Sequence, residues 1–372
     1  MIKVYVSFII SVLLFSCGSK TCDYEKFIQG DWEIIPFIDT MLHDGERTPP
    51  PLPRYVGDLG FYFGENGICE NKVGYFDYTE IDDVGRRLFL GTETRYKIVQ
   101  NTLQIFDLEE NDWQIFEIQK ITNDSLILLY EDKFPVKFIK RHYKIDPETS
   151  FDKIIVSTYG CYGTCPISDI IISKTGDVVF YERKYTTATG AFKSRIKKED
   201  FAKIEKNFKK AEYQNLENSY SNNASDLMAI SVTFIKDDKI IKSIIDYGAA
   251  SPTEFKRALY PLVYLEQKLK LEKVDFNTVL IDLDSGRFKS STAILKLSKP
   301  ELFYLNSELQ NAKESEIAFT SKYILSSANI KDKKIVETDG RFFKIELSNS
   351  KFITLDLGYN FFEQNNFSAI FD

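Results

Sequence analysis

Short strand-like segments follow one another at regular intervals through the first third of this 372-residue chain, and they restrict its fold more than any other feature. Turn-forming pairs such as Asn66-Gly67 and Gln100-Asn101 separate neighbouring segments. The expected strands are 32–37, 59–63, 95–99, 102–106, 113–118 and 125–130. Regular short strands of this kind predict that residues 27–147 form a β-barrel or a β-sandwich.

The pattern changes in residues 148–272, where strands are followed by helices. The expected strands there are 153–158, 169–172, 178–183, 227–235 and 240–245. A helix is expected over 199–211, with an apolar stripe of Phe201, Ile204, Phe208 and Ala211. A second helix begins at a capping box, Ser251-Pro252-Thr253-Glu254, and is expected to reach about residue 271.

The last part, residues 273–372, also has strands around one helix. Another capping box, Ser298-Lys299-Pro300-Glu301, marks the start of that helix. Its apolar stripe has the spacing of the helix at 199–211, so one alternative is that this part is a degenerate repeat of the middle one. The chain as a whole is therefore expected to be α+β and mostly antiparallel β, with a barrel followed by one or two strand-helix-strand domains.

Three motifs in the first third give a resemblance to a known family. They are Gly30-Asp31-Trp32, then Tyr96-x-Ile98-x-x-Asn101-x-Leu103-x-Ile105, then Trp113 followed by Ile118-x-x-Ile121-Thr122 and Leu126-x-Leu128. This part of the chain resembles the lipocalin-like domains of bacterial lipoproteins. The resemblance implies an eight-stranded barrel in which Trp32 closes the base, together with Arg141 from the last strand.

Two interpretations of the barrel interior stay open. Its aromatic side chains either fill a packed core or line a cavity for one small apolar ligand. The residues concerned are Trp32, Phe61, Phe63, Tyr75, Phe106 and Phe116. We favour the packed core, because a barrel of this length encloses little space.

The first residues predict where the protein resides. Lys3 precedes an apolar run over 4–15 that is shorter than the roughly 20 residues of a membrane-spanning helix, so residues 1–16 are identified as a signal peptide. Leu14-Phe15-Ser16-Cys17 resembles a bacterial lipobox, which implies that Cys17 is acylated and that 17–26 form a lipidated tether. The alternative is an uncleaved anchor. Acylation would place the protein in the bacterial cell envelope, on the outer membrane in our interpretation, with the lipid as its contact with the membrane.

A second resemblance concerns the middle of the chain. Here Gly160-Cys161-Tyr162-Gly163-Thr164-Cys165-Pro166 follows a predicted strand and precedes a hairpin turn at 174–177. The pattern resembles the signature of an uncharacterised family of envelope-protein domains, a domain of unknown function. That resemblance implies a fold and no mechanism.

The cysteines allow disulfides in an oxidising compartment. Cys161 and Cys165 are expected to form a structural disulfide, because a redox pair usually has two residues between its cysteines and lies at a helix N-terminus. By elimination, Cys22 and Cys69 are a second candidate pair. The alternative is a free Cys69 buried in a strand.

Charge and histidine content exclude several functions. The formal net charge is −7, and residues 23–147 hold 24 acidic against 14 basic residues, so the net charge provides no attraction for nucleic acid or for anionic lipid. The two histidines, His43 and His142, are far apart in the sequence, and no metal, nucleotide or hydrolase motif is present.

We therefore expect a non-enzymatic envelope protein with a binding or structural role, with no catalytic residues, metal or cofactor. Its expected partners are envelope proteins. The alternative is a carrier that holds a small apolar ligand in the barrel, and an unrecognised enzyme is the third hypothesis.

Overall fold

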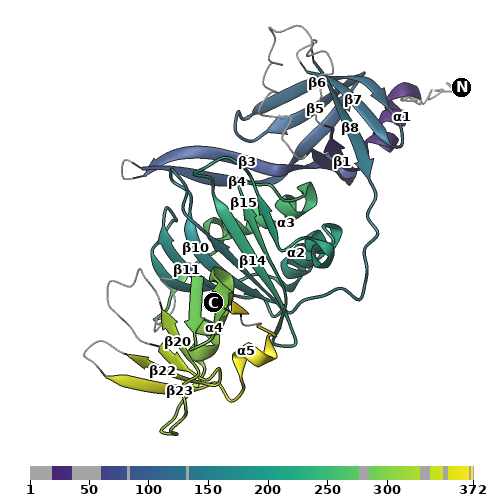
Figure 1. The fold of residues 1–372 in the computed structure, drawn as a ribbon. Helices are drawn as coiled ribbons and strands as arrows, with labels where there is room; N and C mark the ends of the chain where they lie inside the picture. The colour runs from purple at the N-terminus through teal and green to yellow at the C-terminus, as the bar shows by residue number, and fades with distance from the viewer. Residues whose placement is uncertain are drawn as a thin grey trace, which may run out of the picture. The chain divides into compact units, whose positions relative to one another are not determined.

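The computed structural model of this chain describes residues 19–35, 60–81, 84–130, 134–275, 285–326, 336–346, 351–367 and 370–371 (Figure 1). It divides into two compact units. The barrel unit comprises residues 1–75 and 92–142, and the second unit comprises residues 76–91 and 143–372. The predictions for residues 1–16, Cys17 and His43 lie outside the described residues.

The barrel unit contains a closed, eight-stranded antiparallel barrel. Its strands run in chain order, and pairing of the first with the last, which sets Trp32 opposite Lys140, closes the barrel. The strands are β1 (Gly30–Ile34), β2 (Phe61–Phe63), β3 (Ile68–Ile81), β4 (Val84–Val99), β5 (Thr102–Asp107), β6 (Asp112–Ile121), β7 (Ser125–Tyr130) and β8 (Phe134–Arg141). Helix α1 (Ser19–Ile28) precedes them, and a 3₁₀ turn, η1 (Glu65–Gly67), separates β2 from β3. The predicted fold class is confirmed.

Strand β3 is one that the hydrophobic pattern did not reveal. Its sequence contains Asn71 and Lys72, which are nevertheless 5% and 1% exposed. The Lys72 ammonium lies 3.8 Å from the Asp31 carboxylate on β1, so the barrel buries an opposite charge beside it. Because buried polar side chains interrupt the alternation, the sequence alone does not delimit this strand.

The apolar inward side chains described in the barrel pack as one cluster. It contains Trp32, Phe61, Phe63 and Phe116, each at most 3% exposed, together with aliphatic residues of β5 to β8. Tyr75 is also buried. These aromatic residues therefore occupy the interior as core packing.

Phe106 is not part of this core. On β5 the buried residues are Leu103, Ile105 and Asp107, so Phe106 alternates with them and points to the outer side of the barrel. There its ring meets that of Trp113 edge-on at 5.4 Å. Assigning Phe106 to the core or to a ligand cavity was wrong, because strand alternation places it outside.

Arg141 does not pack against Trp32 either. Its guanidinium pairs with Glu33 at 3.0 Å and stays half exposed, whereas the neighbouring Lys140 lies over the Trp32 ring at 4.7 Å. Lys140 also donates to the carbonyl oxygens of Phe27 and Gln29. The expected basic partner of Trp32 is thus one residue earlier in the sequence, because side chains of β8 alternate between faces.

The middle sheet of the second unit has eight strands in the order β13-β15-β14-β9-β10-β11-β12-β16. Its strands are β9 (Lys153–Thr158), β10 (Ile167–Ser173), β11 (Asp177–Lys184), β12 (Gly190–Arg195), β13 (Ser219–Ser221), β14 (Ala229–Lys236), β15 (Lys239–Tyr247) and β16 (Glu272–Lys273). The hairpin turn expected at 174–177 joins β10 to β11, and Gly176 there has φ +91°.

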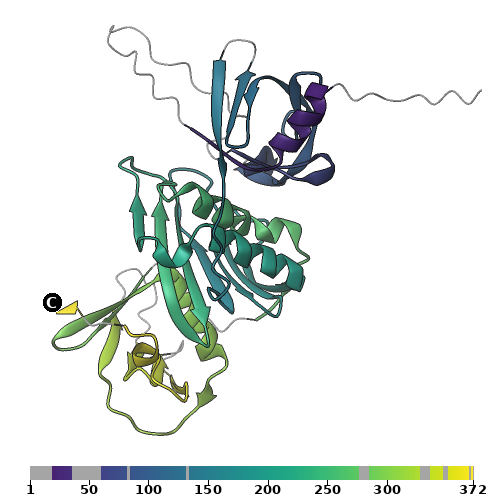
Figure 2. The same ribbon diagram turned by 90° about the vertical axis from the view of Figure 1, so that its right-hand side faces the viewer.

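Helices α2 (Lys198–Lys210) and α3 (Thr253–Val263) pack side by side on one face of this sheet (Figures 1 and 2). Short 3₁₀ turns, η2 (Tyr213–Asn215) and η3 (Leu265–Lys268), follow them. The expected capping box at residues 251–254 does not form. Asp246 instead accepts hydrogen bonds from the amides of Ala250 and Ser251, and Glu254 pairs with Arg257. The helix ends at Val263, before the expected end near 271, and a 3₁₀ turn follows.

Part of the hairpin between β3 and β4 belongs to the second unit. Phe76 and Phe89 lie against the Tyr264 ring, with centroids 5.4 and 5.6 Å away. The Phe89 amide donates to Gln267 at 2.8 Å. Each unit is therefore made of two separate segments of the chain.

The third sheet belongs to the same unit and has the order β19-β23-β22-β21-β20-β17-β18-β24. Its strands are β17 (Ser285–Lys289), β18 (Ala293–Ser298), β19 (Lys313–Glu314), β20 (Tyr323–Ser326), β21 (Val336–Thr338), β22 (Phe342–Glu346), β23 (Phe352–Asp356) and β24 (Ile370–Phe371). Helix α5 (Phe361–Gln364) is a single turn.

Helix α4 (Lys299–Gln310) packs between the middle and third sheets. Its expected capping box forms between Ser298 and Glu301. Leu302, Phe303 and Leu305 share one apolar cluster with Ile155 of the middle sheet and with strands of the third. A helix buried on most of its surface needs apolar residues all round, which explains why its stripe extends beyond one face.

None of the helices in the described ranges is long and apolar enough to cross a membrane.

Candidate functional site

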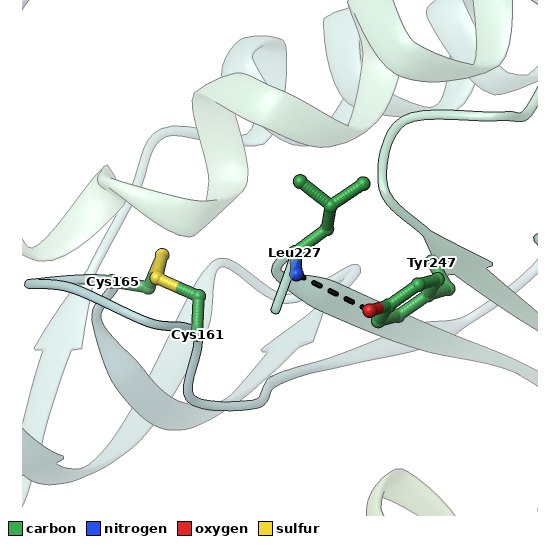
Figure 3. The surroundings of a disulfide bond; sticks show 4 residues. All are labelled: Cys161, Cys165, Leu227 and Tyr247. Atoms are coloured by element: carbon green, nitrogen blue, oxygen red, sulfur yellow. Dashed lines mark hydrogen bonds between the residues drawn. A yellow bond between two sulfur atoms is a disulfide. The ribbon is translucent and has the colours of Figure 1, made fainter. Parts of the chain in front are cut away.

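The Gly-Cys-x-Gly-x-Cys-Pro motif forms a loop between β9 and β10, closed by a disulfide. Cys161 and Cys165 are bonded, with their Cα atoms 5.7 Å apart, which confirms the predicted pair (Figure 3). The loop displays Tyr162, which is 90% exposed. Its backbone is held from one side because the Tyr162 amide donates to the Asp226 carbonyl at 3.1 Å.

The segment that supports this loop is itself fixed by Tyr247 at the end of β15. The Leu227 amide donates to the Tyr247 hydroxyl at 3.2 Å (Figure 3). Gly248 has φ +66°, and a Cβ there would lie 2.3 Å from a methyl carbon of Leu227. Only glycine fits at position 248, because a side chain there would collide with Leu227. The segment 226–227 therefore packs closely against the end of β15.

Beneath the loop, the face of the middle sheet toward α4 holds a buried ion cluster. Asp169 is fully buried and accepts hydrogen bonds from Ser157 Oγ and Arg183 Nη2, each at 2.5 Å. The ammonium of Lys299 lies 3.9 Å from the Oδ1 atom of Asp169. A carboxylate without solvent requires such partners, because the bare charge would be very costly.

Lys299 joins this cluster to the first residues of the loop. It is 1% exposed and donates to the Thr158 carbonyl at 2.5 Å. Its ammonium also lies 5.1 Å from the centre of the Tyr159 ring, whose hydroxyl is 3.2 Å from Ser231 Oγ. The end of β9 is therefore held through a lysine that α4 supplies.

The opposite face of the same sheet end contains Glu182, which is 1% exposed. It lies in a row with Thr158 and Ser168, set by the strand register. Neither Glu182 oxygen has a hydrogen-bond partner within the described part of the chain. The Thr186 hydroxyl is near, but its proton goes to the Ala188 carbonyl at 2.7 Å.

The surroundings of Glu182 favour its protonated form. Burial raises the pKa of its carboxyl well above the ordinary value, and the Glu266 and Asp169 carboxylates raise it further. Glu266 lies in η3 and accepts a hydrogen bond from Thr187 at 2.9 Å. The pair is thus two buried carboxyls, of which Glu182 has the raised pKa.

Two surface grooves on the second unit have linings that include none of these buried groups. One, of about 480 Å³, lies at the C-terminal end of α2 and is lined by Lys144, Ile145, Asp146, Pro147, Thr149, Lys209, Glu212, Gln214 and Asn215. The other, of about 560 Å³, lies on the third sheet and is lined by Lys289, Ser290, Ser291, Ser321, Lys322, Ile324 and Glu337. Substrate in these two grooves would not meet Asp169 or Glu182.

Other candidate residues lie elsewhere. Cys69 is a buried free thiol rather than a partner of Cys22, and burial raises its pKa well above the ordinary value, with Glu70 adding to the effect. The side chain of Cys22 lies outside the described residues. His142 is exposed, with its Nε2 atom 3.3 Å from Asp124. Among the residues that the structure describes, no group of three His, Cys, Asp or Glu side chains could hold a metal.

Residues 152–265 match the family model of a domain of unknown function, DUF6438. The matched segment covers 114 of 372 residues, counted from its bounds, and includes the disulfide loop, α2 and α3. Part of the sequence resemblance, to a domain of unknown function, is thereby confirmed. No curated protein and no solved structure matches the chain.

Sequence reasoning missed the buried cluster beneath the loop. One signal was available, because Asp169 interrupts a buried, largely apolar strand and Glu182 takes a buried position in the alternation of β11. Lys299 gave none, since a lysine in a capping box is ordinarily solvated. Its burial depends on the packing of α4 between two sheets, and α4 lies outside the matched segment.

Proposed function

We propose that this protein is a lipid-anchored component of the bacterial cell envelope, on the outer membrane, that binds a partner and catalyses no reaction. The observation that carries the proposal is the disulfide-closed loop, which exposes 90% of Tyr162 above a rigid sheet end. Exposed tyrosines on rigid loops are typical contact residues in protein interfaces, since little entropy is lost when they bind.

The buried groups under the loop support binding over catalysis. Asp169, Arg183 and Lys299 interact with one another and with the sheet, and at most 16% of any of these side chains is exposed. A catalytic acid or base must reach substrate within hydrogen-bond distance. These ions instead hold the end of β9, from which the loop starts.

The barrel supports the lipocalin-like assignment through its eight strands and through Trp32 beneath Lys140. Its filled interior favours a packing role over the alternative, a carrier for a small apolar ligand. Trp32 Nε1 donates to the Ile28 carbonyl at 2.6 Å, as a tryptophan fixed in a core does.

The anchor is testable by labelling. Cells grown with a labelled fatty acid should yield labelled wild-type protein in the membrane fraction, because the lipobox cysteine would receive the lipid. The Cys17→Ser variant should stay unlabelled and leave the membranes. Equal labelling of both proteins would contradict the anchor.

The binding role is testable by crosslinking in intact cells with the anchor kept. A photoreactive benzoylphenylalanine at position 162 should give a discrete protein adduct. The same group at Ile317, which is 58% exposed in another loop, is the control. The adduct should disappear when Cys161→Ser and Cys165→Ser open the loop. An identical adduct from both positions, or none from position 162, would contradict the proposal.

A further inference from the structure

One face of the third sheet gathers basic side chains from two neighbouring strands and from the residue that precedes a third. Arg287 on β17 is directly opposite Lys296 on β18, and Lys289 is opposite Ile324 on β20. Residues opposite one another in an antiparallel pair share a face, as do residues two apart on a strand. Lys322, two residues before Ile324, lies at the edge of the same face, and all four basic residues are exposed.

No acidic side chain in the described part of the second unit pairs with the basic residues of this face. Within the described ranges, Arg287, Lys289, Lys296 and Lys322 form no ion pair. The one acidic residue in the nearby groove, Glu337, pairs with Lys344 at 3.3 Å. Residues 273–372 hold 14 acidic and 13 basic residues, counted along the sequence, so a nearly neutral segment concentrates unpaired positive charge on one surface.

The groove of about 560 Å³ lies among these residues, and Lys289 and Lys322 both line it. Ser290 and Ser321 also line it but donate their hydroxyl protons to the carbonyl oxygens of Ala293 and Tyr323. Ser291 is exposed, and its side chain has no hydrogen-bond partner among the residues described, so its hydroxyl can donate to a ligand.

We infer that this groove binds a phosphoryl group, with Lys289 and Lys322 as the charged contacts and Ser291 as a hydroxyl donor. Lysine acts as a point charge that suits phosphate oxygens, and a serine hydroxyl adds a directional hydrogen bond. Ile324, half exposed on the groove wall, provides an apolar surface for the organic part of the ligand. Both a soluble phosphate ester and a phospholipid headgroup present this chemistry. The inference is independent of the lipid anchor and of the role of Tyr162.

The experiment uses the full chain with Cys17→Ser, so that no covalent lipid contributes to binding. Glycerol 3-phosphate is titrated in one arm by calorimetry. Vesicles of phosphatidylglycerol, compared with vesicles of phosphatidylcholine, form the other arm in a sedimentation assay. Saturable binding of glycerol 3-phosphate indicates a soluble ester, whereas binding to phosphatidylglycerol vesicles alone indicates a headgroup.

The variant Lys289→Gln with Lys322→Gln should weaken the observed binding about tenfold or more, because both charged contacts are lost. The variant Lys193→Gln with Lys198→Gln removes the same charge from exposed positions on the middle sheet and α2, and should leave binding unchanged. Circular dichroism checks that both variants fold. Binding in neither arm, or equal weakening in both variants, would overturn the inference.

Discussion

The second unit contains two opposite arrangements of charged side chains, one buried and one exposed. At the end of the middle sheet, Asp169, Arg183 and Lys299 are buried and interact with one another. On the outer face of the third sheet, Arg287 and Lys296 are exposed and directly opposite each other, and neither forms an ion pair with a residue that the structure describes. Replacing any single residue of the buried group should lower the stability of the fold strongly. Replacing one of the exposed residues should change it little.

This difference separates structural charges from charges available to a ligand. A buried ion that loses its partner remains desolvated, so the whole penalty appears in the folding free energy. An exposed cation stays hydrated whether or not it has a partner, so its effect on folding is small and its interaction with an anion is available. Measurements of stability therefore test one region, and measurements of binding test the other.

The largest expected effect is that of Asp169→Asn, which would leave Arg183 and Lys299 without their carboxylate. We expect a loss of about 3 to 5 kcal/mol in the unfolding free energy of the second unit. Far-UV circular dichroism in urea measures it. Both tryptophans, Trp32 and Trp113, are in the barrel, so their fluorescence transition should not move.

The control for this change is Glu272→Gln on the same sheet. Glu272 pairs with Lys193 at 3.5 Å, with both side chains more than half exposed, so its loss should cost less than about 1 kcal/mol. Equal costs for Asp169→Asn and Glu272→Gln would show that the buried cluster is not structural.

The second effect depends on pH and concerns Glu182. Its folded-state pKa is raised, so the folded form keeps a proton that the unfolded chain releases. Stability should then fall as pH rises from the ordinary glutamate range toward the folded pKa, by up to about 1.4 kcal/mol per pH unit. The neighbouring Glu266 and Asp169 reinforce this shift, whereas Thr186 and Lys299 oppose it.

Glu182→Gln should remove that dependence. Wild type and variant should have similar stability near pH 5, and the variant should be more stable at pH 7 and 8. Urea unfolding at the three pH values measures the difference. A variant whose stability falls with pH in parallel with the wild type would show that Glu182 is ionised in the folded protein.

The fold was predictable to the extent that hydrophobic periodicity marks its elements. Strand β9 and helix α2 were located to within one residue, because β9 is a short β-branched run and the apolar residues of α2 recur at a period of 3.6. Strand β3 was missed, because the polar residues Asn71 and Lys72 occupy buried positions in it. The charge of Lys72 is compensated by Asp31 on another strand. Such compensation depends on tertiary contacts and leaves no local pattern.

The candidate site was predictable only where the chemistry is local. Cys161 and Cys165 are four residues apart, so their spacing alone indicates a bond within one loop. In the Asp169 cluster, Lys299 lies 130 positions from Asp169 in the sequence, as the difference between 299 and 169 gives. Trp32 was located in the core, but its basic neighbour was misassigned by one residue, which in a strand reverses the face.

The third effect is that of opening the disulfide by Cys161→Ser with Cys165→Ser. A five-residue loop removes little unfolded-state entropy, so we expect a loss of about 2 kcal/mol. Peptide mapping without reductant should first show the bond in the wild type. Urea unfolding of the second unit measures the loss, and a change above that for Asp169→Asn would contradict a purely local role.

The smallest expected effect has the opposite sign and comes from Lys296→Gln. Lys296 is directly opposite Arg287, and like charges across a strand pair destabilise a sheet. Removing one should raise the unfolding free energy by about 0.2 to 0.5 kcal/mol at low salt, and the gain should vanish in 1 M salt. The matched change Lys193→Gln should instead lower stability slightly, because Lys193 is opposite Glu272.

If Lys296→Gln is stabilising, the third sheet keeps a repulsive pair that folding does not require. Such a pair is expected on a surface that binds an anion. A destabilising result would place Lys296 among the structural charges and remove the distinction between the two regions.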